Sequence, residues 1–154
     1  MVLFFSMFLV GRIIASVGLA VLLIAAVQFL LKCAKGVQLI TTGAYSVVRH
    51  PQFTGIITIT VGLTVMVFTL GGIRPEIIGL WLMQILGYIS IAWYEETRLL
   101  KQFGKTFREY KRDVPFIFPI KCPSRIPEIL FTILIALLIC WVLLLFPYDF
   151  IRIL

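Results

Sequence analysis

The chain has 154 residues, of which 61% are hydrophobic and 14% charged, and its formal net charge is +7. A soluble domain has about 45–50% apolar residues, and one of this size cannot bury so much apolar surface, so the composition excludes an ordinary soluble protein. Nucleic-acid binding would need a soluble basic surface with its own fold, and we therefore expect no nucleic acid among the partners.

Four apolar runs predict an all-α integral membrane protein that forms a single membrane domain over residues 1–154. The predicted transmembrane helices cover about residues 3–31, 53–73, 77–94 and 128–147. Each apolar core has about 18–21 residues, which at about 1.5 Å per residue matches a hydrocarbon layer of about 30 Å. The first run lacks the basic start and the cleavage site of a signal peptide, so we interpret it as a helix.

The lysines and arginines predict the orientation of the chain. Segments 32–52 and 95–127 contain eleven of these residues, whereas the opposite connections contain two or three. Cytoplasmic connections are enriched in lysine and arginine, so we expect both segments to be cytoplasmic and both termini to lie on the opposite side. The same residues favour contact with anionic membrane lipids.

The connection between the third and fourth helices has two parts. Apolar and basic side chains alternate at helical spacing over residues 95–112, which predicts that the third helix runs out of the bilayer into an amphipathic stretch at the membrane interface, with Gly104 as a point where it bends or breaks. Prolines at positions 115, 119, 123 and 127 then exclude a regular helix. This proline-rich segment is either a lid folded over the membrane surface or a stiff linker.

The connection between the second and third helices, residues 71–76, is short. The two helices must therefore form an antiparallel hairpin, which brings His50 and Glu95 close together at its cytoplasmic end.

Two motifs flank this hairpin. Arg49 and His50 precede Pro51 at the start of the second helix, where the positive end of the helix dipole favours an anionic group. The alternative is a simple anchor at the membrane interface. Glu95 and Glu96 follow the third apolar run, and carboxylates are costly at the edge of the hydrocarbon unless they have a partner. The alternative is that they reach water and pair with nearby basic side chains.

Both motifs resemble the two signatures of the isoprenylcysteine carboxyl methyltransferase and phospholipid methyltransferase superfamily. The first signature is matched by Leu39-Ile40-Thr41-Thr42-Gly43-Ala44-Tyr45, Arg49-His50-Pro51 and Gly55. The second is matched by Glu95-Glu96, Leu99, Phe103-Gly104, Phe107, Tyr110 and Val114-Pro115. The resemblance spans about residues 13–119 and leaves out the fourth helix.

The resemblance implies a small membrane enzyme that uses S-adenosylmethionine, bound at the cytoplasmic end of the hairpin. Carried over by position, the residues expected to line the cofactor pocket are Tyr45, His50, Pro51 and Gly55. Glu95 or Glu96 is expected to hold the α-amino group of the cofactor. Arg49 or His50 is expected to pair with its carboxylate.

The chain departs from the family pattern where the substrate would bind. The family usually has basic residues on either side of Val-Pro, and this chain has Asp113 and Phe116 there. If the basic residue binds an acidic substrate, we expect either that Arg108 or Arg112 takes over that role or that the protein uses a different substrate. If the acceptor is an amine, Glu109 is one of the candidate bases, together with His50, Glu95, Glu96 and Asp113.

We therefore expect methylation of a lipidic or prenylated small molecule, with the carboxyl group of an isoprenylcysteine-type acceptor first and the amine of phosphatidylethanolamine as the alternative. A reductase resembling the membrane sterol reductases, with NADPH as cofactor, is a second reading. A four-helix transporter or scaffold is a third, suggested by the threonines of the second helix. With one histidine and no Cys/His cluster, we expect no metal site.

Overall fold

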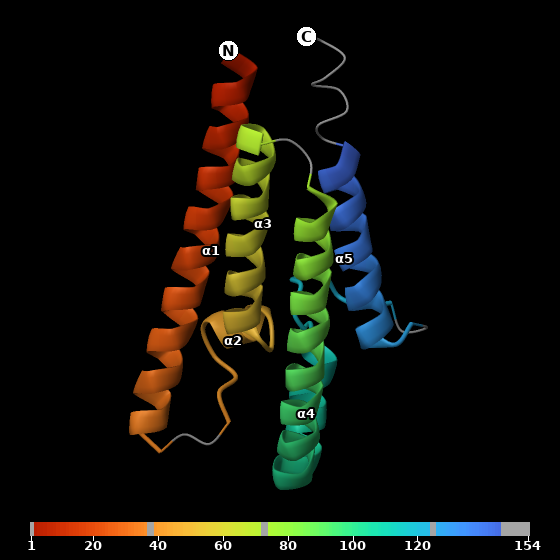
Figure 1. The fold of residues 1–154 in the computed structure, drawn as a ribbon. Coiled ribbons are helices and arrows are strands. Elements are labelled where there is room, and N and C mark those ends of the chain that lie inside the picture. The colour runs from red at the N-terminus through yellow and green to blue at the C-terminus, as the bar shows by residue number, and fades with distance from the viewer. Residues whose placement is uncertain (1, 37–38, 72–73, 124–125, 146–154) are drawn as a thin grey trace.

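The structure, a computed structural model, describes residues 2–36, 39–71, 74–123 and 126–145. All regular elements in these ranges are helices: α1 (Val2–Ala34), α2 (Ala44–Val47), α3 (Pro51–Gly71), α4 (Pro75–Asp113) and α5 (Glu128–Leu145). Of these, α1, α3, α4 and α5 contain segments long and apolar enough to cross a membrane. The predicted all-α membrane fold is confirmed, and Figure 1 shows the four long helices side by side, with α2 beside the start of α3.

The helix boundaries differ from the predicted ones by a few residues. α1 ends three residues later than expected and α3 begins at Pro51, whose fixed φ suits the first helical turn. The expected continuation of the third helix into the amphipathic residues is confirmed, because α4 extends to Asp113. The predicted ends at residues 73 and 147, and the C-terminus, lie outside the described residues.

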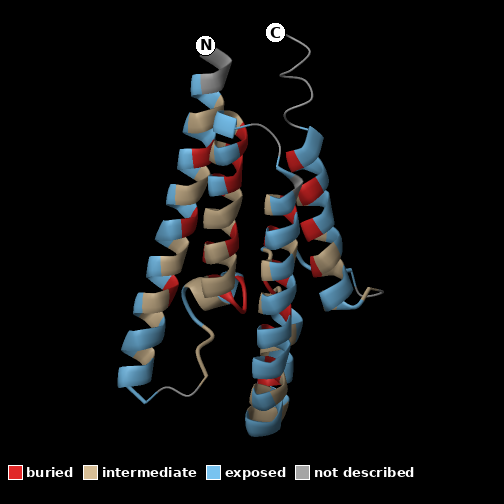
Figure 2. Cartoon of the chain, viewed as in Figure 1, coloured by how far each residue is buried: buried red, intermediate tan, exposed pale blue. Residues whose placement is uncertain are grey.

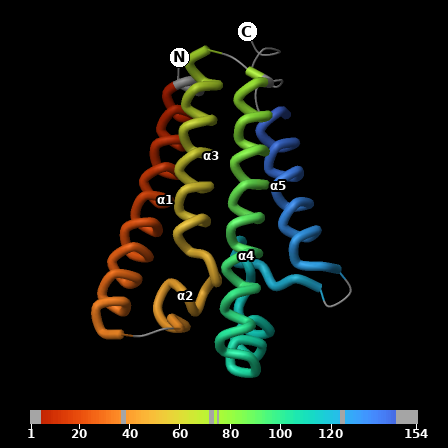
Figure 3. Tube along the Cα trace, turned by 60° about the horizontal axis from the view of Figure 1, so that its bottom comes forward, coloured from red at the N-terminus to blue at the C-terminus, as the bar shows by residue number. Residues whose placement is uncertain are grey.

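Gly104 reverses the direction of α4. Its φ of 51° and ψ of −112° interrupt the helix in a region that favours glycine. Beyond it, the Nζ of Lys111 lies 2.7 Å from the Oε2 of Glu96, although a straight helix would separate these residues by about 22 Å. Residues 105–113 therefore run back alongside residues 95–103, as the green-to-teal turn in Figure 3 shows. The expected break at Gly104 is confirmed.

α1 packs against α3 through glycines. Gly11 and Gly18 of α1 face Gly55 and Gly62 of α3, and a Cβ at Gly62 would lie 2.5 Å from the backbone nitrogen of Ala15. Small residues let membrane helices approach closely, so this glycine seam holds α1 in place. Most of the remaining surface of α1 is exposed or half-buried (Figure 2).

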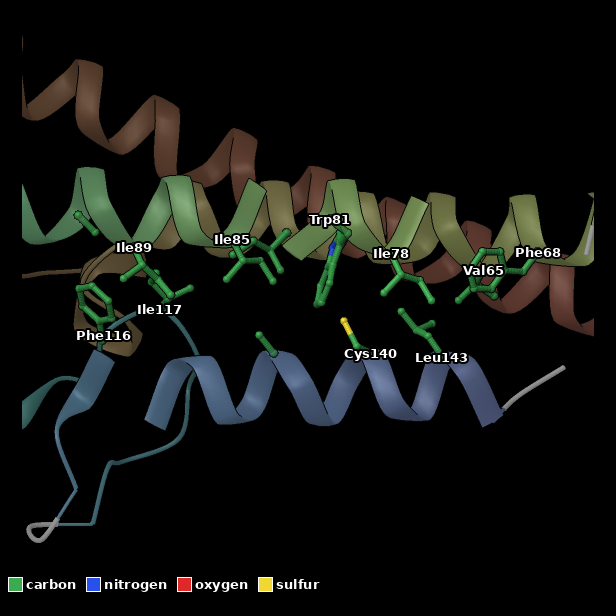
Figure 4. Packing of buried hydrophobic residues seen from close by; sticks show 13 residues of the cluster. Val65, Phe68, Ile78, Trp81, Ile85, Ile89, Phe116, Ile117, Cys140 and Leu143 are labelled. Carbon is green, nitrogen blue, oxygen red and sulfur yellow. The ribbon is translucent and has the colours of Figure 1, made fainter. Parts of the chain in front are cut away.

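The other long helices pack through bulky apolar side chains. Figure 4 shows this core, in which Trp81 and Ile85 of α4 face Cys140 of α5. Trp81 also donates a hydrogen bond of 3.1 Å from Nε1 to the Oγ1 of Thr60 in α3. Phe116 and Ile117, which follow α4, fill the core at the end of the bundle where α3 begins, and we call this the motif end.

Candidate functional site

A cavity of about 680 Å³ lies at the motif end, which is within the range of small-molecule sites. It opens between the last turns of α1, the segment before α3 and residues 95–110 of α4. Its described lining consists of Phe29, Cys33, Gly36, Leu39, Ile40, Tyr45, Arg49, His50, Pro51, Gln52, Phe53, Glu95, Glu96, Arg98, Leu99, Gln102, Phe107 and Tyr110.

The first motif is fixed to α1 by a side chain. The Oε1 of Gln28, near the end of α1, accepts a hydrogen bond of 2.9 Å from the backbone N–H of Ala44. Gly43 directly before it has a φ of 69°, which L side chains rarely adopt. A Cβ at Gly43 would also collide with the side chain of Gln28. The turn into α2 therefore depends on this glycine and this glutamine together.

The proline-rich segment holds the first motif from the other side. The backbone N–H of Arg49 donates to the carbonyl of Pro115 at 2.9 Å, and that of His50 donates to the carbonyl of Phe116 at 3.3 Å. Phe116 is buried, and its ring lies under the guanidinium of Arg49 and edge-on to His50. None of the described residues of the segment lines the cavity. The segment therefore supports the first motif through two backbone hydrogen bonds and the ring of Phe116.

Six charged side chains meet at the motif end and form what we call the charge cluster: Arg49, His50, Glu95, Glu96, Lys111 and Glu128. The Nη1 of Arg49 lies 3.2 Å from the Oε1 of Glu96, and its Nη2 lies 2.8 Å from the Oε2 of Glu128. The Nζ of Lys111 contacts both carboxylates, at 2.7 and 3.3 Å. The Arg49 side chain is only 1% exposed, so these partners must offset the cost of removing its charge from water.

His50 lies between the paired carboxylates. Its Nδ1 is 3.5 Å from the Oε2 of Glu95 and its Nε2 is 3.4 Å from the Oε1 of Glu96. Burial by itself would lower the pKa of His50, but the two carboxylates outweigh it and raise the pKa above its usual value. The hairpin prediction, which placed His50 beside Glu95, is confirmed.

The two adjacent glutamates have different environments. The Glu96 side chain is 6% exposed and is paired with Arg49, His50 and Lys111, whereas that of Glu95 is 51% exposed and, among the described residues, is ion-paired with His50 alone. One helical turn further along the same face of α4, Arg98 is exposed and lines the cavity, with its guanidinium 5.9 Å from the centre of the Tyr94 ring. Among the described residues it has no carboxylate partner. Glu95 therefore offers a carboxylate, and Arg98 a guanidinium, that can each pair with an oppositely charged group of a ligand.

Most of the expected cofactor residues line the cavity, namely Tyr45, Arg49, His50, Pro51, Glu95 and Glu96. Gly55 does not, because it lies in the glycine seam against the backbone of Leu22. Arg108, Glu109 and Arg112, expected to act on the substrate, are exposed and do not line the cavity. The reversal of α4 turns them away from it, while Phe107 and Tyr110 of the same stretch face inward.

Sequence reasoning missed four contributors: Gln28, Arg98, Lys111 and Glu128. Lys111 and Glu128 could not be placed without the reversal at Gly104 and the path of the irregular segment after α4. Arg98 carried a signal, because it lies three residues after Glu95 and such residues share a helix face.

One protein-family model matches the chain over residues 2–114, and its description is "Protein of unknown function (DUF1295)". The match includes both motifs and ends one residue after α4, so that α5 and Glu128 lie beyond it. No curated protein and no solved structure matches the chain.

Proposed function

We propose, from the premise that the chain belongs to the DUF1295 family, that it is a membrane methyltransferase that uses S-adenosylmethionine and acts on a lipidic acceptor. The observation that carries the proposal is the convergence of Glu95, His50 and Arg98 on one cavity at the motif end. The resemblance of both motifs to the methyltransferase signatures supports it.

The free charges of the cavity fit the amino-acid end of this cofactor, which has an ammonium and a carboxylate group. Glu95 would accept hydrogen bonds from the ammonium, because it is the half-exposed member of the glutamate pair. Arg98 would pair with the carboxylate. Arg49 is the weaker candidate for that role, because two protein carboxylates already hold its guanidinium.

Buried polar atoms support the presence of a ligand at this place. The guanidinium nitrogens of Arg49, the Nε2 of His50 and the Oε1 of Glu96 are buried, and in the part of the chain that the structure describes none of them reaches hydrogen-bond geometry. The Oε1 of Glu96 lies within ion-pair distance of Arg49 and His50, and the Nη2 of Arg49 lies within ion-pair distance of Glu128. Such groups are uncommon in folded proteins and are usually satisfied by water or a bound molecule.

The chemistry needs little from the protein beyond positioning. The bound cofactor supplies a methyl group on a sulfonium, and the acceptor forms the new bond to carbon while the electron pair of the broken bond stays on sulfur. The chain must hold the two molecules in line and exclude water. A carboxylate acceptor needs no base, whereas an ammonium acceptor must lose a proton, for which Glu95 and His50 are the cavity groups at hand.

The lining favours an acceptor with an apolar part. Phe29, Leu39, Ile40 and Leu99 supply apolar surface beside the charged groups. We propose carboxyl methylation of an isoprenylcysteine-type acceptor first. The amine of phosphatidylethanolamine is the alternative, and the two differ in whether the rate depends on a base.

A reductase is the second candidate, because the DUF1295 family is associated with steroid 5-alpha-reductase-like membrane proteins. Its cofactor, NADPH, carries several phosphate charges and would need a strongly cationic pocket. Here Glu95 and Glu96 line the same cavity as Arg49 and Arg98, so the charges nearly balance. This lining favours a ligand with one ammonium and one carboxylate over a dinucleotide.

Calorimetric titration of the detergent-purified protein with S-adenosylhomocysteine and, separately, with NADPH tests the proposal. We expect the first ligand to bind and Glu95→Gln to weaken its binding about tenfold or more, since a charge-assisted hydrogen bond contributes about 1.5–3 kcal/mol. Glu109→Gln is the matched control, because Glu109 is an exposed glutamate of the same helix outside the cavity. Binding of NADPH alone would overturn the methyltransferase in favour of the reductase.

We also propose that the motif end faces the cytoplasm, which the excess of lysine and arginine in segments 32–52 and 95–127 supports. Cys33 is exposed at this end and gives a direct test. A membrane-impermeant maleimide should label Cys33 only after intact cells are permeabilised. Labelling of intact cells would reverse the proposed orientation.

A further inference from the structure

We infer that Glu128, the first residue of α5, is a positioning residue of the site: it holds Arg49 so that His50 keeps both of its carboxylate partners. The inference extends the site to a helix beyond the family match. Its consequence for cofactor binding rests on the proposed function, whereas its consequence for His50 does not.

The geometry around Arg49 is the first step. Its guanidinium lies between two carboxylates from different helices, with Glu96 of α4 on Nη1 and Glu128 of α5 on Nη2. The contact with Glu128 is the shorter of the two, 2.8 Å against 3.2 Å. A guanidinium that is 1% exposed has no water to replace a lost partner, so without Glu128 it would rely on Glu96 alone.

The second step is that both carboxylate oxygens of Glu96 already have cationic partners. Its Oε1 is the oxygen that faces both the Nη1 of Arg49 and the Nε2 of His50, at 3.2 and 3.4 Å. Its Oε2 is taken by Lys111. If Glu128 is neutralised, Arg49 and Lys111 each lose one of their two carboxylate partners, and Glu96 is the one that remains to both. His50 then competes with two permanent cations for one carboxylate, and with Arg49 for the same oxygen.

The charge balance of the cluster points the same way. With His50 protonated, three cations (Arg49, His50, Lys111) face three carboxylates (Glu95, Glu96, Glu128). Removal of one carboxylate leaves an excess positive charge, and His50 is the only one of the three cations that can release a proton near neutral pH. The loss of Glu128 should therefore favour the neutral form of His50, although the two side chains do not touch in the described structure.

The single histidine of the chain makes this measurable. In protein labelled with ¹³C and ¹⁵N at histidine, NMR spectra of the detergent-solubilised chain report on His50 alone. We expect Glu128→Gln to lower the titration midpoint of His50 by about half a pH unit or more, since nearby charges shift a pKa by about 1–3 units. The conservative variant Glu128→Asp keeps the charge and should give a midpoint between the two.

Glu76→Gln is the matched control. Glu76 lies in the first turn of α4 as Glu128 lies in the first turn of α5, so both substitutions remove the same favourable interaction with a helix N-terminus. Glu76 is exposed and has no ion-pair partner among the described residues. If Glu128 only stabilises the start of its helix, both variants lose similar stability and His50 titrates as in the wild type. That result would overturn the inference.

Binding of S-adenosylhomocysteine separates the inference from the proposed function. We expect Glu128→Gln to weaken this binding about three- to tenfold while Glu76→Gln leaves it unchanged. A wild type that binds no S-adenosylhomocysteine contradicts the proposed function, but the histidine titration still decides the role of Glu128.

Discussion

The hydroxyl of Tyr110 donates a hydrogen bond of 2.6 Å to the backbone carbonyl of Tyr45. The two residues belong to different motifs and both line the cavity. The bond is possible only because α4 reverses at Gly104 and carries Tyr110 back toward the start of α3. It joins the two motifs directly, independently of the charge cluster.

We expect Tyr110→Phe to reduce both stability and ligand binding. The carbonyl of Tyr45 would lose its partner in a half-buried place, which costs about 1–3 kcal/mol. Unfolding in denaturing detergent, followed by circular dichroism, measures the change. Tyr94→Phe is the control, because Tyr94 is exposed and donates no hydrogen bond in the described part of the chain. Equal losses in the two variants would mean that the Tyr110 hydroxyl does not join the motifs.

The raised pKa of His50 predicts a pH dependence of stability. A histidine whose pKa is higher in the folded than in the unfolded state contributes stability below its unfolded pKa of about 6.5, and this contribution is lost as pH rises through the folded pKa. We expect the wild type to lose stability between about pH 6.5 and its folded pKa, by about 1.4 kcal/mol for each unit by which that pKa is raised. His50→Gln should lack this loss. A wild type and a variant with parallel pH profiles would contradict the prediction.

Gly104→Ala should lower both the stability of the protein and its affinity for S-adenosylhomocysteine, although Gly104 does not line the cavity. No atom lies within 4 Å of the position that its Cβ would take, so any cost arises from the backbone conformation alone and should be about 1–3 kcal/mol. Because Phe107 and Tyr110 reach the cavity through this reversal, affinity for S-adenosylhomocysteine should fall as well. The matched control is Gly87→Ala, which also has open space for a Cβ but lies in a regular part of α4. Unchanged affinity in Gly104→Ala would show that the reversal does not depend on glycine.

The glycine seam predicts opposite effects for two similar substitutions. A Cβ at Gly62 would press on the backbone of α1, so Gly62→Ala should destabilise the protein by about 1–3 kcal/mol. Gly87→Ala meets no neighbour and should be neutral or slightly stabilising, because alanine favours the helix. Denaturing-detergent unfolding compares the two. Equal stability of both variants would mean that α1 is not held by the seam.

The fold was predictable because the length and the apolar character of a run determine whether it can span a bilayer. The continuation of the third helix beyond residue 94 was predictable for a physical reason. Leaving the hydrocarbon changes which residues are tolerated, but nothing between residues 94 and 103 breaks a helix. Gly104 is compatible with a bend, a break or a reversal, and helical spacing continues on both sides of it. Only the tertiary contacts of Tyr110 and Lys111 select the reversal.

The site was predictable where it depends on neighbouring helices and not where it depends on irregular chain. The short turn of the hairpin was enough to place His50 beside Glu95. The four prolines after α4 exclude a regular helix but do not specify the path of the chain, so the return of Phe116 and Ile117 to the first motif could not be foreseen. For the same reason the sequence predicts a helix from residue 128 but does not place Glu128 at the site.

The contact between Arg49 and Glu128 also sets an order of events in biosynthesis. Chains emerge from the ribosome N-terminus first at about 5–20 residues per second, so Arg49 is made on the order of ten seconds before Glu128. During that interval the guanidinium lacks its closest carboxylate, and an arginine without partners is held in water rather than in a protein interior. Insertion of the last helix therefore supplies the remaining carboxylate partner of Arg49. A nascent chain that has not yet delivered α5 has both motifs but lacks this contact.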